Sequence, residues 1–168
     1  MEIHVQEMVS KGLKRSLRAS LNADWLQEVR KDIIGASPLE VDLTARGEEG
    51  IAYVEGELSI SVDIACSRCL EPTNERVAVP FAEKFKPAAS RKPSNDEEVI
   101  IVEEDPVDLE PFFEDTMLLS LPFAPLCSEN CKGLCHTCGA NLNEQNCGCT
   151  KDEIDPRLAA LKDLFKDR

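Results

Sequence analysis

Hydrophobic and polar positions alternate most regularly between residues 57 and 66. The apolar positions fall at every second residue, at Leu58, Ile60, Val62, Ile64 and Cys66. A period of two places these side chains on one face, so the segment predicts a half-buried antiparallel β-strand. Residues 39–44 alternate in the same way, and the sequence at residues 46–50 is typical of a turn.

A second reversal of the chain is predicted at the C-x-x-C sequence of residues 66–69. Val77, Val79 and Phe81 begin the returning strand. Pro80 cannot donate a hydrogen bond to a neighbouring strand, so this strand should lie at an edge or carry a bulge. Residues 99–102 predict one more strand. The first C-x-x-C therefore lies at a hairpin tip, where a metal ion could be shared with another segment.

Helical spacing of apolar residues is found in three other segments. After a short strand at residues 3–6, the basic segment 11–34 predicts helix, interrupted at residues 20–24. Asp108 is expected to cap a helix that ends before Pro122. Residues 155–165 predict a short amphipathic C-terminal helix with proline at its first position. Residues 86–98, rich in proline, serine and asparagine, predict an exposed loop.

Together these segments predict an α+β fold. We expect an antiparallel β-sheet or partly open barrel with flanking helices and a C-terminal Cys-rich, zinc ribbon-like module. Residues 1–120 should form the β-rich domain, with the basic helical segment and an acidic helix. Residues 121–168 should form the Cys-rich metal-binding module and the C-terminal helix, packed with the first part as one unit.

Eight cysteines are sufficient for two tetrahedral all-thiolate metal sites. Joining the Cys135/Cys138 pair to the Cys147/Cys149 pair closes a loop of about eight residues. Joining the Cys66/Cys69 pair to the Cys127/Cys131 pair closes about 57 residues and costs roughly 1.7 kcal/mol more, which a structural zinc ion easily offsets. We therefore hypothesise two Zn²⁺ sites, one local and one that ties the module to the sheet.

Three other interpretations of the cysteines remain open. Disulfides need an oxidising compartment, but the first 20 residues lack the apolar region of a signal peptide, which favours a reducing cytoplasm. The spacing of Cys131, Cys135 and Cys138 also matches the iron–sulfur triplet of radical-SAM enzymes, although 168 residues are too few for their barrel. A thiol redox protein needs one exposed cysteine of low pKa, and paired spacings do not indicate one.

Charge is distributed unevenly along the chain. The formal net charge is −13, which argues against broad nucleic-acid affinity, and residues 94–130 contain no lysine or arginine. That acidic stretch could contact a basic partner such as a ribosomal protein. Any polyanion contact is expected near the N-terminus, where the basic residues are Lys11, Lys14, Arg15, Arg18, Arg30 and Lys31. Lys11, Lys14, Arg15 and Arg18 are the candidate RNA-binding residues among them.

Several functional classes lack their sequence signals. There is no apolar run long enough for a membrane span, no phosphate-binding glycine loop and no G-x-S-x-G. The two histidines, His4 and His136, do not form a catalytic arrangement, and His136 lies within a cysteine knuckle. We therefore expect a protein that is not an enzyme and has no small-molecule substrate.

Long stretches of the chain match the motifs of one known family. They are Cys66-Ser67-Arg68-Cys69-Leu70, Val107-Asp108-Leu109, Leu121-Pro122, Pro125-Leu126-Cys127, Cys131-Lys132-Gly133-Leu134-Cys135, Cys138-Gly139-Ala140-Asn141-Leu142-Asn143, Cys147-Gly148-Cys149 and Asp155-Pro156-Arg157-Leu158 with Leu161. In these motifs the chain resembles the YceD (DUF177) family of large ribosomal RNA subunit accumulation proteins. One departure is His136, where the family's knuckle usually has proline. Residues 1–57 carry no matching motif.

The resemblance implies a cytoplasmic, non-catalytic factor for accumulation or processing of large-subunit (23S) ribosomal RNA, and hence for ribosome assembly. Its partner would be that RNA or a pre-ribosomal particle. Arg68 at the hairpin tip is a candidate phosphate contact, because a guanidinium group pairs bidentately with phosphate.

Overall fold

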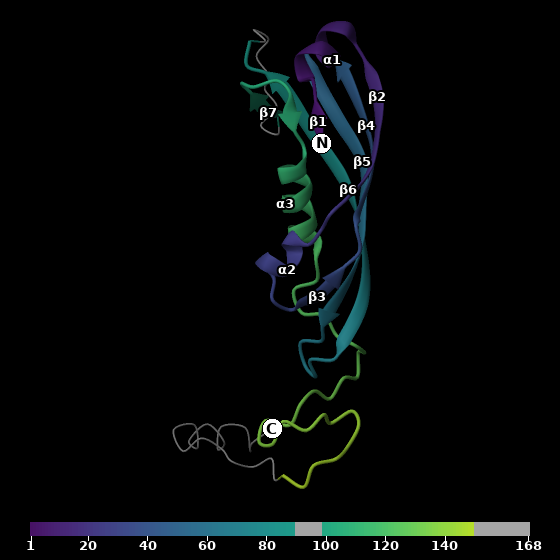
Figure 1. Cartoon of the computed structure of the whole chain (residues 1–168), viewed down its shortest axis with the longest axis vertical. Coiled ribbons are helices and arrows are strands. Elements are labelled where there is room, and N and C mark those ends of the chain that lie inside the picture. The colour runs from purple at the N-terminus through teal and green to yellow at the C-terminus, as the bar shows by residue number, and fades with distance from the viewer. Residues whose placement is uncertain (90–98, 150–168) are drawn as a thin grey trace, which may run out of the picture.

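A curled six-stranded sheet forms the body of the protein in the computed structural model, which describes residues 1–89 and 99–149 (Figure 1). Five strands lie in the order β2-β4-β5-β6-β7, and β3 pairs with the end of β5 that precedes the first C-x-x-C. The strands are β2 (Lys14–Leu21), β3 (Ile33–Ala36), β4 (Leu39–Glu48), β5 (Ile51–Ala65), β6 (Pro72–Pro87) and β7 (Val99–Val102). The sheet with its few helices confirms the predicted α+β class.

Two long hairpins connect the central strands. The β4–β5 turn places Glu49 and Gly50 at positive φ, at 50° and 92°. Residues 66–71 join β5 to β6, and the first C-x-x-C lies at this tip, as predicted. Gly56 in the middle of β5 allows a close approach of β4, because a Cβ there would lie 2.2 Å from the Asp42 carbonyl oxygen.

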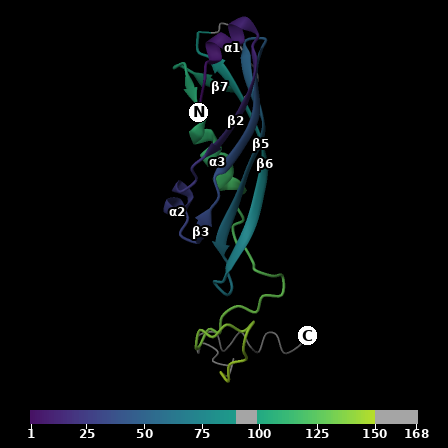
Figure 2. The ribbon, with the colours of Figure 1, turned by 45° about the vertical axis from the view of Figure 1, so that its right-hand side comes forward.

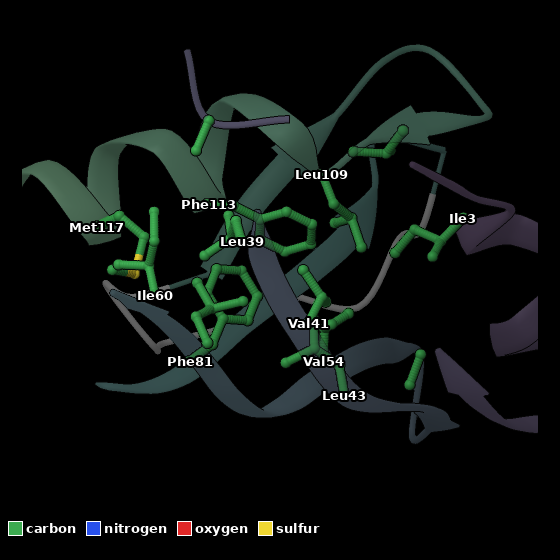
Figure 3. Close-up of a cluster of buried hydrophobic side chains, with 14 of the residues drawn as sticks. Ile3, Leu39, Val41, Leu43, Val54, Ile60, Phe81, Leu109, Phe113 and Met117 are labelled. Carbon is green, nitrogen blue, oxygen red and sulfur yellow. The ribbon is translucent and has the colours of Figure 1, made fainter. Parts of the chain in front are cut away.

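The inner face of the sheet is covered by α3 (Glu110–Ser120) (Figure 1). Phe113 of this helix is fully buried and packs edge-on against Phe81 of β6, with ring centroids 5.1 Å apart (Figure 3). Met117 lies on the same side of the helix and is also fully buried. The alternating apolar residues of β4 and β5 therefore face a helix, and the core lies between these two layers.

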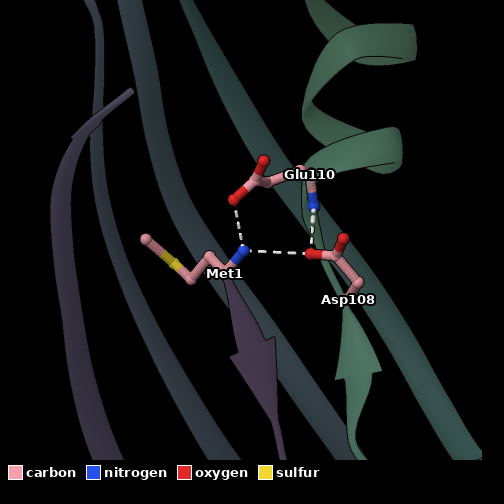
Figure 4. Close-up of polar contacts among 3 residues, drawn as sticks. All are labelled: Met1, Asp108 and Glu110. Carbon is pink, nitrogen blue, oxygen red and sulfur yellow. Dashed lines mark hydrogen bonds and ion pairs between the residues drawn. The ribbon is translucent and has the colours of Figure 1, made fainter. Parts of the chain in front are cut away.

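The N-terminal residues are held by the segment that precedes α3. Short strands β1 (Glu2–Ile3) and β8 (Val107–Asp108) pair with each other. The Met1 ammonium group donates to the carboxylates of Asp108, at 2.9 Å, and Glu110 (Figure 4). Asp105 accepts the backbone N–H of Val5 at 2.8 Å, which satisfies the N-terminus of α1 (Val5–Lys11) from far along the chain.

The basic N-terminal segment differs from its predicted structure. Residues 14–21, expected to be helical, form the edge strand β2. In the remainder of the predicted helix only Lys11, which ends α1, and α2 (Trp25–Val29) are helical, and Ile33 begins β3. Every second residue of β2 (Leu17, Ala19 and Leu21) packs against the core. Pairing with β4 therefore overrode the helical spacing, because β2 completes the sheet alongside a neighbour that already alternates.

Two smaller differences concern the second half of the chain. Strand β7 runs parallel to β6, so the sheet is mixed and not purely antiparallel. Lys86 and Pro87, expected in a loop, end β6 and are buried. The predicted C-terminal helix at residues 155–165 lies outside the described residues. Pro80 pairs only with β5, because β7 begins further along β6, so the proline lies on an edge as predicted.

The Cys-rich segment, residues 121–149, follows α3 in the chain. It lies beyond the β5–β6 hairpin tip, at one end of the sheet, in both views (Figures 1 and 2). Within the described residues it contains one isolated bridge, Leu134 with Asn141, and no helix. No helix in residues 1–89 or 99–149 is long and apolar enough to cross a membrane.

Candidate metal centres

The first group of four cysteines joins the hairpin tip to the Cys-rich segment. Its members are Cys66, Cys69, Cys127 and Cys131, and their sulfur atoms all lie within 4.8 Å of one another. The Cys66–Cys131 and Cys69–Cys127 sulfur distances are 3.8 and 3.5 Å. Three of the four cysteines are buried, and Leu126 and Leu134 pack against them. This small cluster is separate from the core between the sheet and α3.

Backbone hydrogen bonds hold the two segments of this group together. The N–H of Ser67 donates to the Pro125 carbonyl at 2.8 Å, and the N–H of Leu134 donates to the Arg68 carbonyl at 3.0 Å. The guanidinium group of Arg68 donates to the Cys131 carbonyl at 2.9 Å. Arg68 therefore bridges the hairpin tip and the Cys-rich segment with both its main chain and its side chain.

The second group lies entirely within the Cys-rich segment. Cys135, Cys138, Cys147 and Cys149 bring their sulfur atoms within 4.8 Å of one another. The knuckle at residues 135–139 is closed by a hydrogen bond from the Gly139 N–H to the Cys135 carbonyl at 2.8 Å. Gly139 has a φ of 73°, a conformation that glycine adopts readily. These two groups are the two expected from the sequence.

The electrostatics within each group are asymmetric. Burial opposes ionisation of Cys66, but the backbone N–H groups of Cys127, Cys69 and Arg68 outweigh it and lower the pKa of this thiol to about 6. The N–H groups of Cys138 and Thr137 lower the pKa of Cys135 to about 6. Hydrogen bonding to the Cys138 sulfur raises the pKa of Cys149 to about 12. Hydrogen bonds within the protein thus favour ionisation of some cysteines in a group and oppose ionisation of others. A bound cation would be needed to keep all four cysteines of a group ionised.

The first group has the sulfur spacing of a tetrahedral thiolate-bound metal ion, and the second brings four sulfur atoms within 4.8 Å of one another. A zinc–sulfur bond of about 2.3 Å places tetrahedral sulfur atoms about 3.8 Å apart. The sulfur distances of 3.5 and 3.8 Å in the first group are close to this value. The structure records all eight cysteines as free. Two groups of four cysteines in this protein could therefore bind metal ions.

The iron–sulfur triplet considered from the sequence is divided between the groups. Cys131 belongs to the first group, whereas Cys135 and Cys138 belong to the second. These three cysteines therefore do not surround a common site. His136 lies in the knuckle at residues 135–139 but is not a member of either group of cysteines.

The residues predicted to contact RNA lie at opposite ends of the sheet. Lys11 ends α1 and pairs with Glu7 at 2.8 Å, and Lys14 and Arg15 begin β2 nearby. Arg18 lies further along β2, exposed, and pairs with Asp42 at 3.1 Å. Arg68 lies at the other end of β5, a strand of 15 residues that spans about 45 Å. Any contact made by Arg68 is therefore separate from one made by the N-terminal residues.

A row of residues that the sequence did not single out extends the N-terminal basic region. In the strand register, Lys14 lies opposite Arg46, Arg46 opposite Tyr53, and Tyr53 opposite Lys84. Directly paired residues share a face of the sheet, so the row crosses four strands. The Arg46 guanidinium carbon lies 5.1 Å from the centre of the Tyr53 ring. Identifying this row required the strand register, which the sequence alone did not provide.

Acidic residues limit the extent of this basic row. Arg46 pairs with Glu55 at 3.3 Å and with Glu48 at 3.8 Å. Further along the same face, Glu40, Asp42 and Glu57 line a shallow depression beside Arg18. A polyanion would be repelled from that part of the sheet.

The fold and site define a class of protein with a curled β-sheet whose hairpin tip is joined to a Cys-rich segment through shared cysteines. The profile of the family described as "Large ribosomal RNA subunit accumulation protein YceD" matches residues 54–165, two thirds of the chain. The chain belongs to the YceD family. The matched region contains both groups of cysteines.

Individual relatives are also similar to this chain. An uncharacterised protein of Mycobacterium tuberculosis is 34% identical over 129 residues, which cover 76% of this chain and 62% of the relative. YlbN of Bacillus subtilis is 31% identical over 147 residues, 84% of this chain and 82% of YlbN. The chloroplastic YCED homolog 1 of Arabidopsis thaliana, named as a large ribosomal RNA subunit accumulation protein, is 23% identical over 162 residues, 80% of this chain and 50% of the relative.

The chain thus spans under two thirds of the length of the mycobacterial relatives and half of the Arabidopsis protein. No solved structure gives a significant match.

Proposed function

We propose that this protein is a non-catalytic factor in the accumulation of large-subunit ribosomal RNA and in assembly of the large ribosomal subunit, acting in the cytoplasm. The observation that carries the proposal is the family match over residues 54–165, since relatives in that family are named for this role. The sheet, hairpin tip and Cys-rich segment would then act as a binding module.

Zinc is the metal that we propose for both groups of cysteines. Four thiolates suit a soft tetrahedral cation, and such closed sites support folding and leave no position open for substrate. Cys66, Cys69, Cys127 and Cys131 would bind one ion and attach the segment to the sheet. The second ion would be bound by Cys135, Cys138, Cys147 and Cys149.

RNA contact is proposed at the basic end of the sheet. Lys11, Lys14 and Arg15 bring positive charge to this end. Arg46 and Tyr53 add a cation and an aromatic ring on the outer face. Phosphates pair with such cations, and an unpaired base can stack on such a ring. Arg68 is a second candidate, because one of its five N–H donors is used by the Cys131 carbonyl and others could reach phosphate.

A basic ribosomal protein is a further proposed partner. Glu103, Glu104, Glu114 and Asp115 are exposed around the start of α3 and on it. Asp105 and Asp108 serve the fold, because they bind the N–H of Val5 and the Met1 ammonium group. The carboxylates of Glu103, Glu104, Glu114 and Asp115 are therefore the ones proposed to contact such a partner.

Depletion of the protein from cells tests its proposed role. Sucrose-gradient analysis should show less large-subunit RNA relative to small-subunit RNA, and the protein itself should be found with immature large subunits. An unchanged RNA ratio, with all of the protein at the top of the gradient, would contradict the proposal.

Charge reversal tests the proposed RNA surface. A Lys14→Glu variant should associate more weakly with precursor particles, and the loss should shrink as salt rises, because phosphate contacts release counterions. Lys31→Glu is the matched control, since Lys31 is exposed but lies beyond α2. Equal losses in both variants would contradict a specific contact at the N-terminal end of β2.

A further inference from the structure

Asn143 connects the two groups of cysteines. It lies between Cys138 and Cys147, in the loop that the second group closes. Its side-chain nitrogen Nδ2 donates to the sulfur of Cys131, a member of the first group, at 3.3 Å. A side chain carried by one candidate metal centre therefore hydrogen-bonds a ligand of the other.

The orientation of the Asn143 amide follows from its partners. The backbone N–H of Lys132 donates to the Asn143 oxygen Oδ1 at 2.7 Å. A backbone N–H can only donate, so the amide atom facing it must be the oxygen, and the nitrogen must face the sulfur. The second hydrogen of Nδ2 is directed to the Asn141 oxygen Oδ1 at 3.0 Å. All of the polar atoms of this amide are thus used.

The loop that carries Asn143 is aligned with the chain of the first group. Leu142 donates its N–H to the Gly133 carbonyl at 2.9 Å, and Leu134 and Asn141 form an antiparallel bridge. Residues 131–134 in turn contact Arg68 at the hairpin tip through the Leu134 N–H and the Cys131 carbonyl. A continuous set of hydrogen bonds therefore runs from the loop that carries Asn143 to the hairpin tip of the sheet.

From this geometry we infer that Asn143 is a positioning residue for Cys131 and couples metal binding at the two groups. A metal at the second group fixes the loop, the loop fixes Asn143, and the Asn143 amide orients the Cys131 sulfur toward the metal of the first group. Coupling between binding sites is reciprocal, so metal at the first group strengthens binding at the second by the same factor. The inference rests on the proposed occupancy of both groups by metal.

Zinc affinity measured separately for the two groups tests the coupling. Zinc-bound cysteines resist alkylation during competition with a chelator, and tryptic cleavage after Lys132 separates Cys131 from the four cysteines of the second group. Asn143→Ala should weaken zinc binding at the first group by about 10- to 100-fold, the usual effect of losing a hydrogen bond to a metal ligand. Asn146→Ala is the matched control, because Asn146 lies in the same loop and makes no hydrogen bond to a cysteine sulfur within residues 1–89 and 99–149.

A double-mutant cycle distinguishes coupling from a merely local effect. Cys138→Ser/Cys147→Ser, which disables the second group, should also weaken zinc binding at the first group. The same change should have little further effect in the Asn143→Ala background, because the connection is already lost. The inference would be overturned if the two changes lowered zinc affinity at the first group independently, so that their fold-losses multiply in the combined variant. It would also be overturned if the Asn143→Ala protein kept wild-type zinc affinity at the first group.

Two further measurements keep the test informative. Asn143→Asp retains an oxygen that accepts the Lys132 N–H and removes the donor to the Cys131 sulfur. It should therefore weaken zinc binding at the first group even if Asn143→Ala misfolds. Fluorescence of Trp25, which packs against the sheet core, reports whether each variant retains its sheet. A wild-type protein that binds no zinc would overturn the proposed metal sites together with the coupling, whereas two tightly bound ions without coupling would overturn the inference alone.

Discussion

Single residues decide how the Cys-rich segment meets the sheet. Gly133 has a φ of 74°, and a Cβ at this position would lie 3.0 Å from the Arg68 carbonyl oxygen. Arg30 reaches the same junction from the end of α2, where its Nη1 and Nη2 atoms donate to the Pro122 carbonyl at 3.1 Å. Gly133 thus positions the backbone close to Cys131, and Arg30 positions the backbone at the end of α3. Neither residue is a candidate metal ligand.

Gly133→Ala should weaken zinc binding at the first group. Gly139 serves as the control, because its φ is 73° but nothing lies within 4 Å of a Cβ built there. Both substitutions incur the left-handed backbone cost of about 1–2 kcal/mol, and only Gly133→Ala also meets the Arg68 backbone. Zinc affinity, measured for each group by chelator competition, should fall more for Gly133→Ala at the first group than for Gly139→Ala at the second. Equal losses would show that the contact with Arg68 is unimportant.

Arg30→Met should destabilise the protein by about 1–2 kcal/mol at neutral pH, because it removes charged hydrogen bonds to Pro122 and Asp32. The hydrogen bond from Arg30 lowers the pKa of Asp32. A lowered carboxyl pKa stabilises the fold above the unfolded value of about 4 and ceases to do so as the pH falls through the folded value. Denaturant unfolding should therefore show that the difference from wild type shrinks below about pH 4. Lys31→Met, at the exposed neighbouring position, should change little at any pH.

At the scale of elements, one helix against one curled sheet produces most of the core. The fully buried residues of α3 face β6 and the alternating residues of β4 and β5. Phe81 and Phe113 meet at the centre of this contact, and Phe85 and Phe112 form a second edge-on pair with centroids 5.2 Å apart. The helix thus makes aromatic contacts at two successive places along β6.

Phe113→Ala should lower the free energy of unfolding by about 3–5 kcal/mol, since it opens a cavity in a fully buried position. Phe123→Ala is the control, because this phenylalanine is 97% exposed just beyond α3. Its effect should be within about 0.5 kcal/mol. Urea unfolding monitored by circular dichroism measures both values. A large loss for Phe123→Ala would indicate that Phe123 is buried against another part of the protein.

At the scale of the whole molecule, two separate buried clusters stabilise two parts of the chain. The larger cluster lies between the sheet and α3, and the smaller contains Cys66, Cys69 and Cys131 with two leucines. Hydrogen bonds at the β5–β6 hairpin tip join the parts. We propose that residues 1–120 and 121–168 behave as one unit while both metals are bound.

Removal of metal should uncouple these parts. A strong zinc chelator should increase amide hydrogen exchange in residues 122–149, whereas β4, β5 and β6 should stay protected because their core contains no metal ligand. Zinc added back should restore protection, and a chelator already saturated with zinc is the control. Simultaneous loss of protection in the sheet would show that the metal centres and the sheet unfold together.

The sequence by itself determined the elements with a strong local signal. The alternation at residues 57–66 required a half-buried strand, and the short loop from Cys138 to Cys147 favoured a local group of cysteines, which left the other four to combine. Family motifs added the expected role. Each of these signals depends on residues close in sequence or on characteristic spacings. These predictions therefore did not require knowing which strands pair in the folded protein.

Tertiary structure decided what depended on distant partners. Residues 14–21 have helical spacing but form a strand because β4 offers an edge to pair with. The parallel pairing of β7, the alignment of Lys14 with Arg46 and Tyr53, and the separation of Arg68 from the N-terminal basic residues all follow from strand register. The contact of Asn143 with Cys131 likewise arises only when two loops fold against each other. Local pattern fixes which face of a strand is buried, whereas the choice of neighbour depends on packing across the whole chain.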